Sequence, residues 1–148
     1  MIPERVLAQI YAHARAAYPE ECCGFLYGQP IDQAQPVENR QNELHRLDPE
    51  RFPRDAGTAY NMAVGDIRVL EKSLRSARPV RVIYHSHCEV GAYFSDEDKR
   101  AATWDGEPLY PVDHLVVDVR QEGVRGAKLF RFDAARRDFV EIAAYPGA

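Results

Sequence analysis

Two histidines separated by a single residue, His85 and His87, are the strongest chemical signal in this chain. They end the run VRVIYHSH, whose Val, Ile and Tyr residues predict a β-strand. Side chains alternate between the two faces of a strand, so both imidazoles project to the same side. Two imidazoles on one face pack poorly in a core but can bind a metal ion together. Taken alone, such a pair is more often incidental than catalytic.

An aspartate, Asp98, follows the two histidines, and the segment between His87 and Asp98 determines whether its carboxylate can reach them. Seven residues separate His87 from Ser95, and Asp98 comes three positions after Ser95. The stretch around Gly91 lacks periodicity and predicts a loop, whereas FSDEDKRAATW predicts a helix with Ser95 at its N-cap. In isolation, Ser95 and Asp98 are explained as a variant of the capping box. A strand, loop and helix in this order can also return Asp98 to the histidines, and the cap would then fix the position of the acid.

This combination predicts a catalytic rather than a structural metal site. Structural zinc usually has four protein ligands, often cysteines, whereas catalytic zinc keeps three and leaves one position open for water. The bound water then has a pKa near about 7, so hydroxide is available at neutral pH. His85, His87 and Asp98 are therefore the candidate zinc ligands, and a general base remains to be identified.

Composition limits the other classes of function. The length of 148 residues favours one domain over residues 1–148. A hydrophobic content of 45% and a net charge of −4 are ordinary for a globular protein. No basic run indicates a nucleic-acid surface. No apolar stretch has the length of a membrane span, and the N-terminus lacks a signal-peptide pattern. Three cysteines, of which Cys22 and Cys23 are adjacent, do not form a disulfide framework, so we expect a cytoplasmic protein.

The remaining pattern predicts an α/β (α+β) sandwich with a mixed central sheet of about six strands flanked by helices. Apolar periodicity predicts helices over 4–18 and 58–77, although Gly65 weakens the first half of the second. Further strands are expected at 22–27, 35–42, 112–120, 127–133 and 138–145. We expect His13 to face solvent, and His45 and His114 to be structural or exposed rather than metal ligands.

Two motifs resemble those of the JAMM (MPN+) metalloprotease family, in particular its small prokaryotic members. The family pattern of His-x-His, seven residues, Ser, two residues and Asp is met by His85, His87, Ser95 and Asp98. Its upstream pattern Pro-x-Glu-x-Cys-Gly is met by Pro19, Glu21, Cys23 and Gly24. The resemblance covers most of the chain. It implies a JAB/MPN-like, cytidine-deaminase-like sandwich, Zn²⁺ as cofactor, and Glu21 rather than Glu20 as the catalytic acid.

One residue departs from the family pattern. The family commonly has Pro directly after the second histidine, where this chain has Cys88. The change concerns the rigidity of the loop and not the set of ligands. A Cys88 thiolate as a metal ligand is the less favoured alternative, because zinc would then lose its open position. Cys22 and Cys23 are expected to be strand residues rather than a redox pair.

The resemblance implies a zinc-dependent peptidase or isopeptidase in which metal-activated water attacks the carbonyl. Glu21 would accept the proton of that water and pass it to the leaving amine, and the Ser95 hydroxyl would stabilise the oxyanion. Small bacterial relatives imply a ubiquitin-like sulfur-carrier protein as substrate, with an extended Gly-Gly tail that can pair with a sheet edge. A homodimer is one of the assemblies that remain open.

Other functions would use the same site residues differently. A non-catalytic MPN scaffold is disfavoured because such proteins lack the ligand residues that are present here. An Fe(II) enzyme could use two histidines and one carboxylate, but Glu21 and Ser95 have no necessary role in it. A lyase or a nucleic-acid enzyme on the same metal site also remains open.

Overall fold

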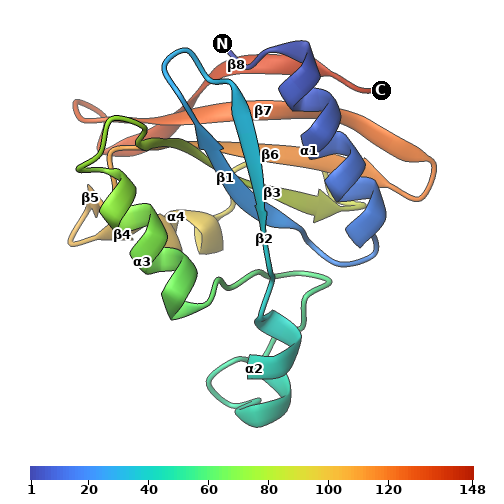
Figure 1. Cartoon of the computed structure of the whole chain (residues 1–148). Helices are drawn as coiled ribbons and strands as arrows, with labels where there is room; N and C mark the ends of the chain where they lie inside the picture. Colours follow the sequence, from blue (N-terminus) through green and yellow to red (C-terminus); the bar gives the residue numbers. More distant parts are fainter.

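A mixed six-stranded sheet forms the centre of the protein, whose computed structural model describes residues 1–148 (Figure 1). Its strand order is β2-β1-β3-β6-β7-β8, and only the central pair, β3 and β6, runs parallel. The strands are β1 Cys23–Tyr27, β2 Gln33–Val37, β3 Val80–Cys88, β6 Asp113–Arg120, β7 Gly123–Asp133 and β8 Asp138–Pro146. The predicted fold class and the six strands are therefore confirmed.

Four helices and a small hairpin complete the fold. They are α1 Glu4–Ala17, α2 Gln41–Leu47, α3 Val64–Ser73 and α4 Asp96–Ala102, with the hairpin strands β4 Thr103–Trp104 and β5 Glu107–Pro108. In Figure 1, α1 lies across one face of the sheet, whereas α3 and α4 lie on the opposite side. None of these helices is long and apolar enough to cross a membrane.

The structure corrects the predicted elements between residues 35 and 77. The strand expected at 35–42 ends at Val37, and the unpredicted helix α2 follows it. The chain turns because the Asn39 side-chain oxygen accepts a hydrogen bond from the Gln41 amide at 3.0 Å. The helix expected at 58–77 covers only Val64–Ser73. The residues before Val64 have no regular structure instead, and the Asn61 carbonyl accepts a hydrogen bond from the Arg40 amide at 2.7 Å.

Each face of the sheet has its own core, and the alternation along β3 separates them. Val82 and Tyr84 pack under α1, together with the fully buried Val6 and Ile10 of that helix. On the other face, Ile83 packs in a second core with residues that include Leu70 of α3. A third core on this second side is formed by Val116 and the aromatic residues Phe94, Phe130 and Phe139. His85 contacts this aromatic group, so the two motif histidines lie on the face opposite α1.

One prediction about α1 is wrong. His13 is not fully solvated, because it is partly buried and its Nδ1 lies 2.8 Å from the Tyr84 hydroxyl. Burial lowers the pKa of His13. Tyr84 is fully buried and reaches through the core toward α1, which brings its hydroxyl within reach of the helix.

Candidate metal centre

The three candidate ligands converge on one point. The Nε2 atoms of His85 and His87 lie 3.1 Å apart. Asp98 Oδ1 is 3.2 Å from His85 Nε2, and Asp98 Oδ2 is 3.3 Å from His87 Nε2. Zinc bonds of about 2.0–2.1 Å in tetrahedral geometry place neighbouring ligand atoms about 3.3 Å apart. The spacing of this side-chain cluster therefore fits a tetrahedral metal ion.

Hydrogen bonding around the imidazoles supports the same conclusion. His87 Nδ1 lies 3.0 Å from the Gly91 carbonyl oxygen, which can only accept, so Nδ1 carries a proton and Nε2 of the neutral ring offers its lone pair. This carbonyl plays the part of the outer partner that fixes the tautomer of a metal-bound histidine. His85 is fully buried, and its Nδ1 has no hydrogen-bond partner. Its ring stacks on Tyr60 with the centroids 4.6 Å apart, which holds its orientation.

The electrostatics of the cluster favour a bound cation. Burial opposes the charge of Asp98, but the nearby imidazoles of His85 and His87 outweigh it, so the pKa of Asp98 is lowered. Burial lowers the pKa of His85, which favours its neutral form. Burial also disfavours the charged form of His87, yet Asp98 and Glu21 raise the pKa of His87 overall. A negative carboxylate thus faces two imidazole nitrogens, and a metal ion would satisfy all three groups.

The first turn of α4 places Asp98 and Ser95. The Ser95 side chain accepts a hydrogen bond from the Asp98 amide, and Asp98 Oδ2 accepts one from the Ser95 amide, each at 3.0 Å. This reciprocal pair is a capping box, so the structural explanation of these residues is confirmed and coexists with convergence on the histidines. Because the Ser95 oxygen acts as acceptor in the cap, its hydroxyl hydrogen remains free to donate elsewhere.

Glu21 lies at the entrance of β1 and is fixed through its backbone. Its amide donates to the Ala56 carbonyl at 2.7 Å, and its carbonyl accepts from Asn39 Nδ2 at 2.9 Å. The next amide, of Cys22, donates to Ser86 Oγ at 2.8 Å, which ties this entrance to the histidine strand. Glu21 therefore occupies a defined position beside β3.

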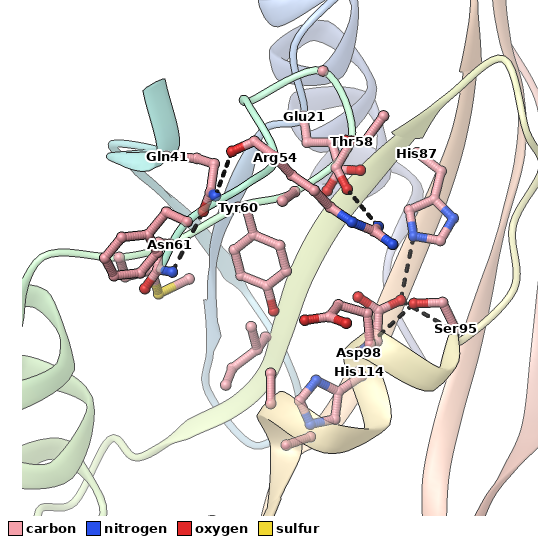
Figure 2. Close-up of a pocket in the computed structure, with 18 of the residues that line it drawn as sticks. Glu21, Gln41, Arg54, Thr58, Tyr60, Asn61, His87, Ser95, Asp98 and His114 are labelled. Carbon is pink, nitrogen blue, oxygen red and sulfur yellow. Dashed lines mark hydrogen bonds and ion pairs between the residues drawn. The ribbon is translucent and has the colours of Figure 1, made fainter. Parts of the chain in front are cut away.

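The Glu21 side chain is only 6% exposed and lines the same pocket as His87, Ser95 and Asp98 (Figure 2). Burial raises its pKa to about 8, and the charge of Asp98 adds to this, whereas His87 and Arg54 oppose it. Glu20, by contrast, is exposed, and its carboxylate accepts a hydrogen bond from Asn42 at 2.6 Å. Of the two adjacent acids, only Glu21 lines the pocket.

The pocket has a volume of about 740 Å³, and segments distant in the sequence form its walls. One wall comes from the segment between α2 and α3, including Arg54 and Tyr60, and another from Ser95 to Ala102. His114 lies at its base beneath Asp98 in the view of Figure 2. Its burial lowers its pKa to about 3, and it does not join the three-residue cluster.

Several residues of this pocket have no signal in the sequence. His114 is a lone histidine at the start of a strand, and its place follows from the parallel pairing of β6 with β3, where it faces Ile83. His114 is buried and borders the site, and its role stays a prediction. Arg54 and Tyr60 belong to a polar stretch without periodicity, and only the folded loop brings them to the histidines.

Cys23 is a strand residue as predicted, whereas Cys22 lies just outside the strand. None of the three cysteines forms a disulfide, and Cys23 begins β1 with Cys22 directly before it. Cys88 ends β3 and packs against the core beneath α1. The cluster that could hold a metal ion consists of His85, His87 and Asp98 without a thiol.

Comparison with known proteins identifies the family. Residues 3–130 match the family described as prokaryotic homologues of the JAB domain. The chain is 34% identical over 93 residues to proteins named CysO-cysteine peptidase from Mycobacterium bovis and Mycobacterium tuberculosis. This match covers 62% of the chain and 58% of each relative, so the chain aligns with less than two thirds of those proteins.

Solved structures agree at the level of the fold. A protein from Desulfitobacterium hafniense superposes with a TM-score of 0.61 at 20% identity, over 94% of this chain and 86% of the other. A protein from Salinibacter ruber gives a TM-score of 0.61 at 22% identity, over 95% and 87% of the two chains. Together with the matched family region and the spacing of the ligand residues, these findings show that the chain belongs to the prokaryotic JAB-domain branch of the JAMM/MPN family.

Proposed function

We propose that this protein is a zinc-dependent peptidase. The observation that carries the proposal is the convergence of His85, His87 and Asp98 at 3.1–3.3 Å in a pocket that also contains Glu21. Three nitrogen and oxygen ligands with space beside them are typical of catalytic rather than structural zinc. Family membership and the peptidase name of the mycobacterial relatives support the same reaction class.

When bound, zinc would act as a Lewis acid and lower the pKa of a coordinated water. Glu21 is the group that exchanges protons. Burial raises its pKa in the metal-free protein, and the positive charge of bound zinc would lower that pKa again, so the carboxylate beside the ligands can accept a proton in one step and return it to the leaving amine in the next. Ser95 has the complementary role, since its free hydroxyl hydrogen can be donated to the oxygen on which negative charge develops.

The proposed substrate is the C-terminal tail of a ubiquitin-like sulfur-carrier protein that ends in Gly-Gly before the cleaved bond. The name CysO-cysteine peptidase of the relatives supports an amino acid joined to a carrier protein. Because β3 is paired on both sides, by β1 and β6, the tail cannot pair with the histidine strand itself. We propose that it enters between the wall formed by 51–62 and the wall formed by α4, both of which line the pocket.

Metal analysis and a cleavage assay test this proposal together. Protein purified without added metal should contain stoichiometric zinc and should shorten a Gly-Gly-extended carrier by its terminal extension, as followed by intact mass. Glu21→Gln should keep the zinc and abolish cleavage, whereas Asp98→Ala should lose the zinc. Iron in place of zinc with oxygen uptake, and no cleavage of the carrier, would refute the peptidase assignment. Undiminished cleavage by Glu21→Gln would refute the proton-exchange role of Glu21.

A further inference from the structure

Arg54 is a charged residue that lines the pocket but takes no part in the proposed hydrolysis. Its guanidinium points into the pocket, on the side where Glu21 and His87 lie (Figure 2). Its only hydrogen bond runs from Nη1 to the Thr58 carbonyl, at 3.4 Å, and it forms no ion pair with a carboxylate. Other arginines of this protein do form ion pairs, as Arg78 does with Asp32 at 2.6 Å. Arg54 is thus a cation with unused donors facing the site.

The backbone of Arg54 is nevertheless held in place. Gln41 Nε2 donates to the Arg54 carbonyl at 2.8 Å, and the Gln41 residue is only 4% exposed. Gln41 is itself contacted by Asn61 Nδ2 at 3.4 Å, so the loop is fixed from both sides (Figure 2). The buried Gln41 amide therefore fixes the backbone from which the Arg54 side chain, itself an exposed residue, extends over the pocket. An arginine offers several donors in a fixed planar array, which matches a carboxylate in a two-point contact.

We propose that Arg54 binds the free α-carboxylate of a single C-terminal residue and thereby makes the protein specific for releasing one amino acid. This inference rests on the proposed peptidase function. In a peptide the nitrogen of the cleaved bond is followed by Cα and then the carboxyl carbon, which lies about 2.5 Å from that nitrogen. The charge of the last residue is therefore always beside the reacting bond, within the same pocket.

Other substrates would not place a carboxylate at this position. In a longer extension after Gly-Gly, the carboxyl carbon next to the cleaved bond belongs to another peptide amide. In an isopeptide, the nitrogen of the cleaved bond is followed by the methylene chain of lysine. Either would lack the two-point contact of a carboxylate with the guanidinium, so it would bind more weakly than a substrate with a single C-terminal residue. Arg54 is therefore a specificity-determining residue, and hydrolysis itself remains with Glu21 and the metal ligands.

A binding measurement tests the inference independently of turnover. The zinc-loaded Glu21→Gln protein is titrated by calorimetry with a short synthetic peptide ending in Gly-Gly-Ala, as the free acid and as the C-terminal amide. We expect the acid to bind about tenfold to a hundredfold more tightly, since an ionic hydrogen-bonded pair is worth that range. Adding Arg54→Ala should remove this preference, and Arg54→Lys should restore only part of it because lysine lacks the planar array.

Arg51→Ala is the matched control, because Arg51 lines the same pocket but lies over the Phe52 ring at 5.3 Å. It removes an equal charge from the same loop and should keep the preference for the acid. Equal binding of the two peptides to the Glu21→Gln protein, including no measurable binding of either, would overturn the inference.

Cleavage by the wild-type protein separates the two proposals. If the acid and the amide are cut equally well, the role of Arg54 is wrong while the peptidase function stands. If neither is cut but the acid still binds in an Arg54-dependent way, the peptidase function fails and the carboxylate site stands. A loss of rate in Arg54→Ala that is equal for both peptides would indicate that Arg54 positions Glu21 instead, and would also overturn the inference.

Discussion

Replacing Glu21 by glutamine should stabilise the metal-free protein, and increasingly so as the pH rises. Glu21 is 6% exposed, and no hydrogen bond to its carboxylate offsets the loss of solvation. Burial raises its pKa from 4.5 to about 8 in the folded state. The folded protein therefore keeps a proton on Glu21 at neutral pH, whereas the unfolded chain has released it.

The sign follows from this difference in bound protons. Between pH 4.5 and about 8 the folded state binds one more proton at Glu21 than the unfolded state, so the free energy of unfolding falls as the pH rises. The slope is about 1.4 kcal/mol per pH unit while the two states differ by a full proton. From pH 5 to pH 8 the loss amounts to about 3–4 kcal/mol. Glutamine has a similar shape and no proton to release, so the variant lacks this loss.

Urea unfolding of chelator-treated protein at several pH values between 5 and 8 measures the effect. The stability of Glu21→Gln relative to wild type should increase by at least about 2 kcal/mol across this interval. Glu20→Gln is the matched control, since Glu20 is the adjacent acid but is exposed, and its curve should run parallel to that of wild type. Parallel curves for Glu21→Gln and wild type would show that Glu21 does not keep its proton in the folded, metal-free protein, and this account of its burial would be wrong.

Three further substitutions test the supporting geometry. Ser95→Ala should keep the metal, measured by its zinc content, but lower turnover by about 10²–10³ and the unfolding free energy by about 1 kcal/mol, because it removes both the oxyanion donor and the helix cap. Asp98→Asn keeps a side-chain acceptor for the cap but removes the charge, so it should retain most of the stability seen in urea while losing zinc in metal analysis. Gly24→Ala should destabilise the fold by about 1–3 kcal/mol in urea, because an added Cβ would overlap the ring of the fully buried Tyr84. Unchanged stability of Gly24→Ala would mean that Tyr84 does not occupy that space.

The motif-bearing elements could be predicted from the sequence because local rules determine them. Alternation along a strand places His85 and His87 on one face whatever the rest of the chain does. Ser95 begins a helix through a hydrogen bond to a residue three positions away, so its cap and the direction of Asp98 are both local. The apolar strands near the C-terminus were likewise predictable, since β6, β7 and β8 follow one another and pair in that order.

The segment from 38 to 63 could not be predicted, because side chains rather than periodicity determine its path. Asn39 donates to the carbonyls of Glu21 and Ala59 and accepts from the amides of Gln41 and Asn61. Such bonds join residues about twenty positions apart through short polar groups, and polar residues of this kind are also typical of exposed loops. The pocket wall that they create carries Tyr60 and Arg54, so these residues were missed together with the path of the chain.

The polar side chains of this segment hold both the proposed base and the proposed specificity residue. Asn39 holds the backbone of Glu21, and Gln41, two residues later, holds the backbone of Arg54. Asn42 extends the same connection, because its side-chain oxygen accepts from the Ala56 amide while the Ala56 carbonyl accepts from the Glu21 amide. The proposed base and the proposed carboxylate-binding arginine are thus fixed by one continuous hydrogen-bonded unit. Loosening this unit should move both groups relative to the metal ligands, which are held separately by β3 and the capping box.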